Sequence, residues 1–151
     1  MKNFIKSIFG KREKSLQENT EFSKLPNDTQ KYLIESRKLA EKNKQSYELN
    51  EKGIEAERNG EVELAIKFYE ENIKCRFEGS HPYNRLAIIY RKQKRYFDEK
   101  GVLEIAIEVF NNDAYRSRQD LPTKLEKFQE RLDKVNQLIK KQLEEDEKKG
   151  V

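Results

Sequence analysis

Apolar residues recur at helical spacing in two short stretches, and this spacing constrains the fold of the chain more than any other feature. The first stretch has apolar residues at positions i, i+3, i+4, i+7 and i+11, which are Val62, Ala65, Ile66, Tyr69 and Ile73. The second repeats the first four positions with Tyr83, Leu86, Ala87 and Tyr90. This spacing places apolar side chains on one face of an α-helix. Each stretch is therefore predicted to be a helix that buries one stripe of side chains and exposes the rest.

The composition favours thin layers of such helices. Charged residues make up 40% of the 151 residues and hydrophobic residues 34%, whereas an average domain is about 25% charged. This is too little apolar surface for a thick globular core, but an amphipathic helix needs only one apolar stripe. No run of alternating β-branched residues argues for a sheet. The chain is therefore predicted to be all-α.

Turn residues divide the chain into elements. Pro26 disfavours helix at the residue before it, so we predict that residues 1–25 form a flexible arm and that one helical domain covers residues 26–143. Its first helix either ends near Asn43 or continues into the next, since no glycine or proline separates them. Further turns at Asn59-Gly60, at Glu78-Gly79-Ser80 and at Lys94-Arg95 predict two antiparallel helical hairpins, at 46–79 and 80–112. A last helix is predicted at 120–143, followed by a frayed tail at 144–151.

The two hairpins align with each other at a spacing of 34 residues, because Gly53 in the first corresponds to Ala87 in the second. The segment 59–70 also has the sequence pattern of a tight turn followed by the start of a helix, and a known repeat family shares this pattern. Together these features resemble the tetratricopeptide repeat, whose period is about 34 residues. The resemblance covers about residues 46–110. It implies a fragment of an α-solenoid, in which two antiparallel hairpins are flanked by other helices.

The second hairpin departs from the family pattern. The small residue of the family's second helix is Ala65 in the first hairpin, but Glu99 stands 34 residues later. Either a small insertion brings Gly101 to that position, or Gly101 lies inside a helix at a cost of about 1 kcal/mol relative to alanine. Both registers remain open. Because a solenoid normally needs about three repeats, the flanking helices are expected to cover the two ends.

The predicted C-terminal helix has apolar residues spaced by three and four, like a heptad seam. These residues are Leu125, Phe128, Leu132, Val135 and Ile139. The favoured interpretation is a capping helix that lies along the last hairpin. The alternative is a homodimer through a coiled coil, although Gln142 interrupts the seam after barely two heptads.

The resemblance also implies a function, because the first helices of successive tetratricopeptide hairpins line a concave groove. Carried over position by position, the first hairpin would present Tyr47, Asn50, Ile54, Glu57 and Arg58. The second would present His81, Asn84, Arg85, Ile88, Arg91 and Lys92. Asparagine and arginine can hold a peptide backbone or a carboxylate. Chaperone-binding members clamp a C-terminal carboxylate, but Ile54 stands where that clamp needs asparagine. We therefore predict a protein- or peptide-binding adaptor or regulator of another specificity; alternatively these residues are a solvated face, or are covered by the flanking helices.

Two other kinds of partner remain possible interpretations of the basic segments. Residues 91–95 read Arg-Lys-Gln-Lys-Arg between Tyr90 and Tyr96, and such density could neutralise nucleic-acid phosphates. Both tyrosines are needed by the hairpin core, however, which argues against base stacking. Residues 1–14 combine apolar and basic side chains, which permits weak association with an anionic membrane. Both are ranked below protein binding.

Catalysis, cofactors and metals are not expected. The chain has one histidine and one cysteine, and it has no glycine-rich phosphate loop or dinucleotide fingerprint. His81 and Cys75 are two ligands, whereas a structural zinc site takes four. A single cysteine favours a reducing compartment, and neither a secretory signal nor an apolar span is evident. The expected location is the cytoplasm.

Overall fold

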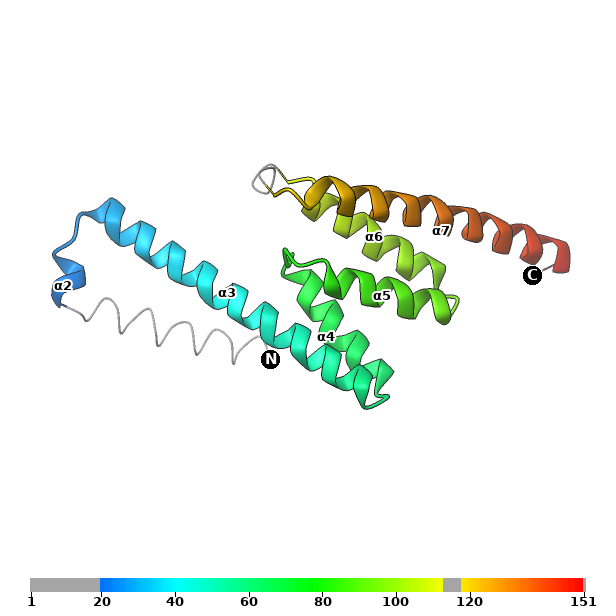
Figure 1. Ribbon diagram of the computed structural model, residues 1–151, viewed down its shortest axis with the longest axis horizontal. Helices are drawn as coiled ribbons and strands as arrows, with labels where there is room; N and C mark the ends of the chain where they lie inside the picture. The colour runs from blue at the N-terminus through cyan, green and yellow to red at the C-terminus, as the bar shows by residue number, and fades with distance from the viewer. Residues whose placement is uncertain (1–19, 113–117, 151) are drawn as a thin grey trace. The chain divides into compact units, whose positions relative to one another are not determined.

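The computed structural model of the chain describes residues 20–112 and 118–150 (Figure 1). All regular secondary structure in these two ranges is helical, which confirms the all-α prediction. Its elements are α2 (Thr20–Ser23), α3 (Asn27–Arg58), α4 (Val62–Lys74), α5 (His81–Lys92), α6 (Tyr96–Phe110) and α7 (Leu121–Lys149). The membrane-anchor prediction for residues 1–14 falls outside the described ranges. None of the described helices has the length and apolar character required to cross a bilayer.

In the described ranges the chain forms two compact units, divided between Lys44 and Gln45. The single domain predicted over 26–143 stays a prediction. In the described part of the first unit, the turn before α3 is held by Gln30, whose side-chain amide donates to the carbonyl oxygen of Leu25 at 2.7 Å. Helix α3 then runs without a break from Asn27 to Arg58. The possible end near Asn43 is therefore not used, because the Leu, Ala, Glu, Lys and Gln residues around it are all good helix formers.

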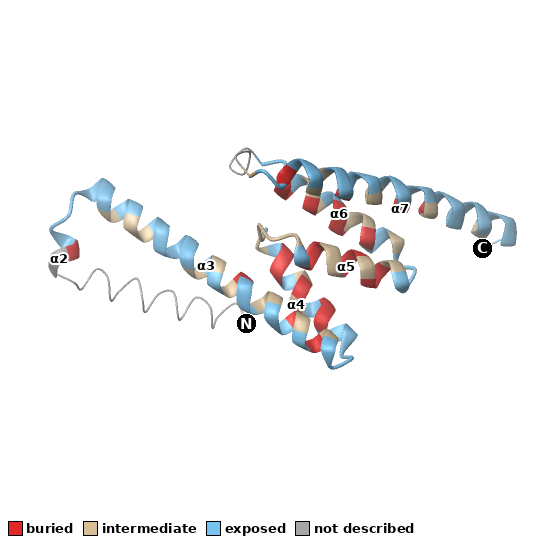
Figure 2. Cartoon of the chain, viewed as in Figure 1, coloured by how far each residue is buried: buried red, intermediate tan, exposed pale blue. Residues whose placement is uncertain are grey.

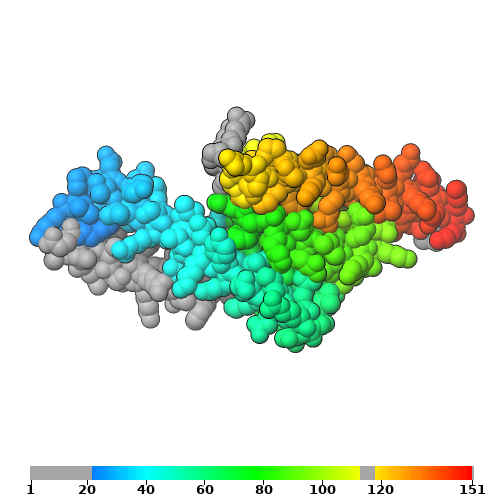
Figure 3. All heavy atoms as spheres, viewed as in Figure 1, coloured from blue at the N-terminus to red at the C-terminus, as the bar shows by residue number. Residues whose placement is uncertain are grey.

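In the second unit, α4 packs against α5, α5 against α6, and α6 against α7 (Figure 1). The last turns of α3 contact α4 through Glu57 and Tyr69. The buried residues of α4 to α7 lie on the sides that these helices turn toward one another (Figure 2). On the face drawn in Figure 3, the outer atoms of these neighbouring helices lie in contact with one another. The largest fully buried side chains are those of Tyr69, Tyr83, Tyr90, Phe110 and Phe128. The core is thus a single layer of aromatic and aliphatic contacts between neighbouring helices.

The turns after α3 and α5 repeat one hydrogen-bond pattern at the predicted interval. In the first, Gly60 has a φ of +78° and the amide of Glu61 donates to the carbonyl oxygen of Ala56 at 2.8 Å. In the second, Lys94 has a φ of +58° and the amide of Arg95 donates to the carbonyl oxygen of Tyr90 at 2.9 Å. Both turns therefore end a helix by a left-handed residue and a bond back across it, as in a Schellman motif.

The second hairpin keeps this register without an insertion. Helix α6 is continuous from Tyr96 to Phe110, and the side chain of Glu99 is buried in it. A Cβ atom added at Gly101 would meet no heavy atom within 4 Å. By contrast, a Cβ atom at Gly53 would lie 2.3 Å from the ring of Tyr69. Gly53 is therefore the site of a close helix approach, whereas Gly101 simply lies inside a helix.

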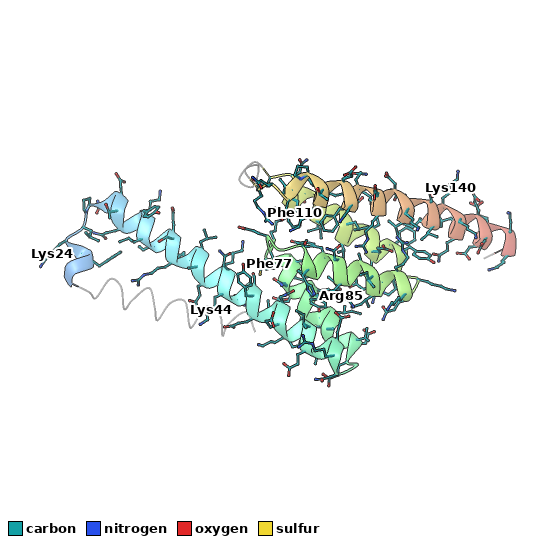
Figure 4. All side chains as sticks on the ribbon, viewed as in Figure 1. Lys24, Lys44, Phe77, Arg85, Phe110 and Lys140 are labelled. Carbon is teal, nitrogen blue, oxygen red and sulfur yellow. The ribbon has the colours of Figure 1, made fainter. Side chains whose placement is uncertain are left out.

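The seam of α7 packs against α6. Phe110 lies at the end of α6 (Figure 4). Its ring is stacked on that of Phe128 with the centroids 5.6 Å apart, and Val135 is fully buried. The apolar face that could form a coiled coil is therefore occupied within the chain. The helix continues to Lys149 and ends at Gly150, whose φ is +71°. The predicted helix ended at residue 143, because the charged residues that follow carry no apolar stripe.

Candidate functional site

Three helix segments lie side by side and run in the same direction: residues 45–58 of α3, then α5, then α7. Contacts between the first two join Asn50 to His81 and Glu57 to Arg85, so both helices advance together. Contacts between α5 and α7 join Tyr83 to Phe128 and Asn84 to Arg131. The polar side chains of these three segments that bond to another helix define what we call the three-helix face. They are Asn50, Glu57, His81, Asn84, Arg85, Arg91 and Arg131.

The junction of α3 and α5 is held by polar groups around Glu57. Its carboxylate accepts two bonds from the guanidinium of Arg85, at 2.9 and 2.6 Å, and one from the hydroxyl of Tyr69 at 2.8 Å. Arg85 lies between α5 and the end of α3 (Figure 4). The hydrogen bonds from Arg85 hold the pKa of Glu57 below its usual value. Burial, followed by the bond to Glu57, raises the pKa of Tyr69.

His81 adds a second contact at this junction. Its Nδ1 atom and Oδ1 of Asn50 are 2.9 Å apart, and its ring meets the ring of Tyr69 edge-on at 5.8 Å. Burial lowers the pKa of His81, because the charged imidazolium loses solvation. The nearby Arg85 acts in the same direction. His81 is therefore a neutral hydrogen-bonding group near pH 7.

The lowered pKa values of His81 and Glu57 predict that the protein loses stability as the pH falls. The folded state takes up a proton on His81 less readily than the unfolded chain, whose histidine has a pKa near 6.5. The free energy of unfolding is therefore highest above that pH and falls as the pH decreases below it. Glu57 changes the free energy of unfolding in the same direction, but at lower pH. Its stabilising contribution is complete above about pH 4.5 and is lost as the pH falls below that value. Denaturant unfolding between about pH 8 and pH 5 should show this fall, and His81→Gln should flatten it. An unchanged slope in that variant would contradict the assignment to His81.

A buried ion pair joins α5 to α6. The guanidinium of Arg91 donates to both carboxylate oxygens of Glu99 on α6, at 2.5 and 2.8 Å. The side chain of Glu99 is 1% exposed and that of Arg91 is 27% exposed. Glu99 is therefore buried at the position that lies 34 residues after Ala65, and Arg91 reaches in from α5 to pair with it.

Arg131 of α7 completes the face. Its Nη1 atom donates to Oδ1 of Asn84 at 2.8 Å. Burial lowers the pKa of Arg131; the attraction of Glu99 opposes that effect and the repulsion of Arg91 adds to it. The sequence does not predict this residue as part of the site, because the apolar seam accounts for the C-terminal helix without it. The available indication was a basic residue between Phe128 and Val135, at the edge of that seam.

The other sequence-predicted groove residues are spread along the same helices. Tyr47 is 63% exposed, with its ring edge-on to Phe77 at 5.3 Å. Ile54 and Ile88 are half-buried. Arg58 and Lys92 are exposed at the last residues of α3 and α5. The structure thus brings together Asn50 with His81, and Arg85 with Glu57. It leaves Arg58 and Lys92 at the ends of their helices.

The basic run 91–95 is partly engaged in the fold. Arg91 is paired with Glu99, and Arg95 is paired with Asp98 at 2.7 Å while its guanidinium lies 4.3 Å from the ring centre of Tyr90. Next to the run is a hollow of about 290 Å³ between Lys94, Tyr96 and the last turns of α7. Its lining mixes three lysines with Glu145 and Asp146. This mixture of charges does not make a continuous phosphate-binding surface.

Across residues 20–112 and 118–150, no three His, Cys, Asp or Glu side chains gather where a metal ion could be held. Cys75 is a half-buried free thiol. Comparison of the chain with models of known protein families, with curated proteins and with solved structures finds no match. The function is therefore inferred from the residues and contacts of this chain.

Proposed function

We propose that this protein is a non-catalytic adaptor or regulator that binds a protein or peptide on its three-helix face. In this proposal the two hairpins form a tetratricopeptide-like solenoid. Residues 45–58 of α3, α5 and α7 then correspond to the first helices of successive repeats. The repeated turns at Gly60 and Lys94 support this arrangement, as do the parallel directions of the three segments.

The row of polar contacts across the three-helix face is the observation that carries the proposal. Guanidinium, amide, imidazole and carboxylate groups from four helices are held in fixed positions by one another, and most of them are only half-buried. Groups that are already ordered lose little conformational entropy when they bind a ligand. A peptide laid along α5 would therefore meet prepositioned donors and acceptors, with Ile54 and Ile88 available for apolar contact.

The choice of variant matters, because several residues of the face also hold the helices together. Replacing Asn84 and Arg85 with alanine would leave Arg131 without its bond to Asn84 and would remove both bonds from Arg85 to Glu57. Loss of binding could then reflect loss of structure. Tyr47 and Lys92 are exposed residues near this face, three residues before Asn50 on α3 and one residue after Arg91 on α5, and they suit the test better.

A library of random short peptides displayed on phage is selected on the full chain, and the affinity of an enriched peptide is measured by fluorescence anisotropy. The Tyr47→Ala/Lys92→Ala variant should bind it about tenfold more weakly, as expected for loss of an aromatic anchor. Phe97→Ala/Lys67→Ala is the matched control on α6 and α4, since Phe97 is 61% exposed and Tyr47 is 63% exposed. The control should keep its affinity. Equal losses in both variants, or no enriched peptide, would contradict the proposal.

A further inference from the structure

The chemistry of a partner can be inferred from four residues between α5, α6 and α7. We call Asn84, Arg91, Glu99 and Arg131 the arginine cluster. Arg91 and Glu99 form a two-bond ion pair, and Arg131 donates to Asn84. Arg131 also interacts electrostatically with both Glu99 and Arg91. The four residues therefore form one electrostatic unit.

The charges of the arginine cluster do not cancel. It contains two guanidinium groups and one carboxylate, which leaves one positive charge in excess. Both oxygens of Glu99 are already bonded to Arg91. Arg131 is partly desolvated, and a desolvated charge is costly unless an opposite charge accompanies it. The cluster is therefore short of one anion.

Arg131 also has hydrogen-bonding capacity to spare. A guanidinium has five N–H donors, and within the described ranges the structure gives Arg131 one hydrogen-bond partner, Asn84. Planar guanidinium groups match carboxylates through two parallel bonds. Arg131 is half-buried, so a carboxylate that reaches its exposed part would supply both the missing charge and the missing acceptors.

We propose that Arg131 receives the side-chain carboxylate of an aspartate or glutamate in a peptide bound on the three-helix face. This inference rests on the proposed function and adds the chemistry of its ligand. A carboxylate carries one negative charge, which equals the excess in the cluster, whereas a phosphoryl group carries about 1.5 to 2. Ile88 lies one helical turn from both Asn84 and Arg91 and is half-buried. The fitting segment therefore has an acidic residue next to an aliphatic one.

The test compares matched peptides on the full chain. The probes are an enriched phage-display peptide, the same peptide with each acidic residue changed in turn to its amide, and a version with phosphoserine at the sensitive position. Affinity is measured by anisotropy for the wild type, Arg131→Gln and Arg131→Lys. Lys140→Gln is the control, because it removes the same charge from an exposed position on the side of α7 away from α6 (Figure 4).

We expect that one acidic residue of the peptide is important for binding. The peptide in which this residue is changed to its amide should bind the wild type about tenfold more weakly, which is the effect expected for one charge-assisted contact. Arg131→Gln should bind both versions equally, Arg131→Lys should keep part of the preference, and Lys140→Gln should keep all of it. Melting curves of each variant check that the fold is intact. If acid and amide versions bind wild type equally, the inference is wrong while peptide binding stands. A phosphoserine version that binds more tightly through Arg131 overturns the choice of carboxylate. If no peptide is enriched, both proposals fail.

Discussion

Replacing Arg91 with methionine is expected to lower the free energy of unfolding by about 3 kcal/mol, because the change leaves a buried carboxylate without its partner. Glu99 is fully buried and both of its oxygens are bonded to Arg91. For a chain of this size the loss corresponds to a fall in melting temperature of about 6–12 °C. The total stability of a domain is about 5–15 kcal/mol, so the variant should remain folded at room temperature. Chemical denaturation measures the difference directly.

A second change should reverse this loss. Adding Glu99→Leu to the Arg91→Met variant removes the unpaired charge and fills its space with an apolar side chain. Replacement of a buried ion pair by apolar residues of similar volume is often neutral or stabilising. The double variant should therefore recover most of the stability. Lys100→Met is the control, because the exposed pair of Lys100 and Glu104 has its charged atoms 3.7 Å apart and should contribute less than about 1 kcal/mol. A similar loss in the control and in Arg91→Met would show that burial of Glu99 is not the cause.

The two helical glycines Gly53 and Gly101 should respond to alanine in opposite directions. Alanine at Gly101 meets no neighbouring atom, so the gain in helix propensity should raise the free energy of unfolding by about 0.5–1 kcal/mol. Alanine at Gly53 would place its Cβ atom 2.3 Å from the ring of Tyr69, which is fully buried and bonded to Glu57. Overpacking of this kind costs about 1–3 kcal/mol.

The cause can be tested with a shorter neighbour. Tyr69→Leu should reduce the cost of Gly53→Ala, because the ring that causes the clash is absent, although it also removes the bond to Glu57. A double-mutant cycle isolates the interaction between the two positions. Additive losses would mean that the close approach of α3 and α4 at Gly53 is not what makes glycine necessary. Gly101→Ala serves as the matched control for the backbone effect of removing a glycine.

The sequence predicted helices and turns well because their causes are local. The stripes at Val62–Ile73 and Tyr83–Tyr90 and the turn at Asn59-Gly60 each depend on a few neighbouring residues. The continuous α3 could not be chosen over two helices, because good helix formers at the possible break permit both. The choice between the two registers of α6 required the partner of Glu99, which lies on α5.

The candidate site was predictable only in part. Its α3 and α5 residues could be carried over from the repeat, because the 34-residue spacing places them on one helix face. Arg131 could not, since its role depends on how α7 lies against α5. The sequence also did not indicate that Asn84, Arg85 and Arg91 would each bond to another helix, because such pairs depend on distances between elements.

The order in which helices α4 to α7 pack has a consequence for how the chain acquires its structure. Each of these helices contacts the one that comes next, so most stabilising contacts join segments close together in sequence. Short loops close at a small entropic cost, and proteins dominated by local contacts fold on microsecond to millisecond timescales. During synthesis, the α4–α5 pair can therefore form before α7 is made. Helix α7 then packs on the apolar side of α6, which has already formed. A ribosome that stalls before α7 is made would therefore leave this apolar side exposed.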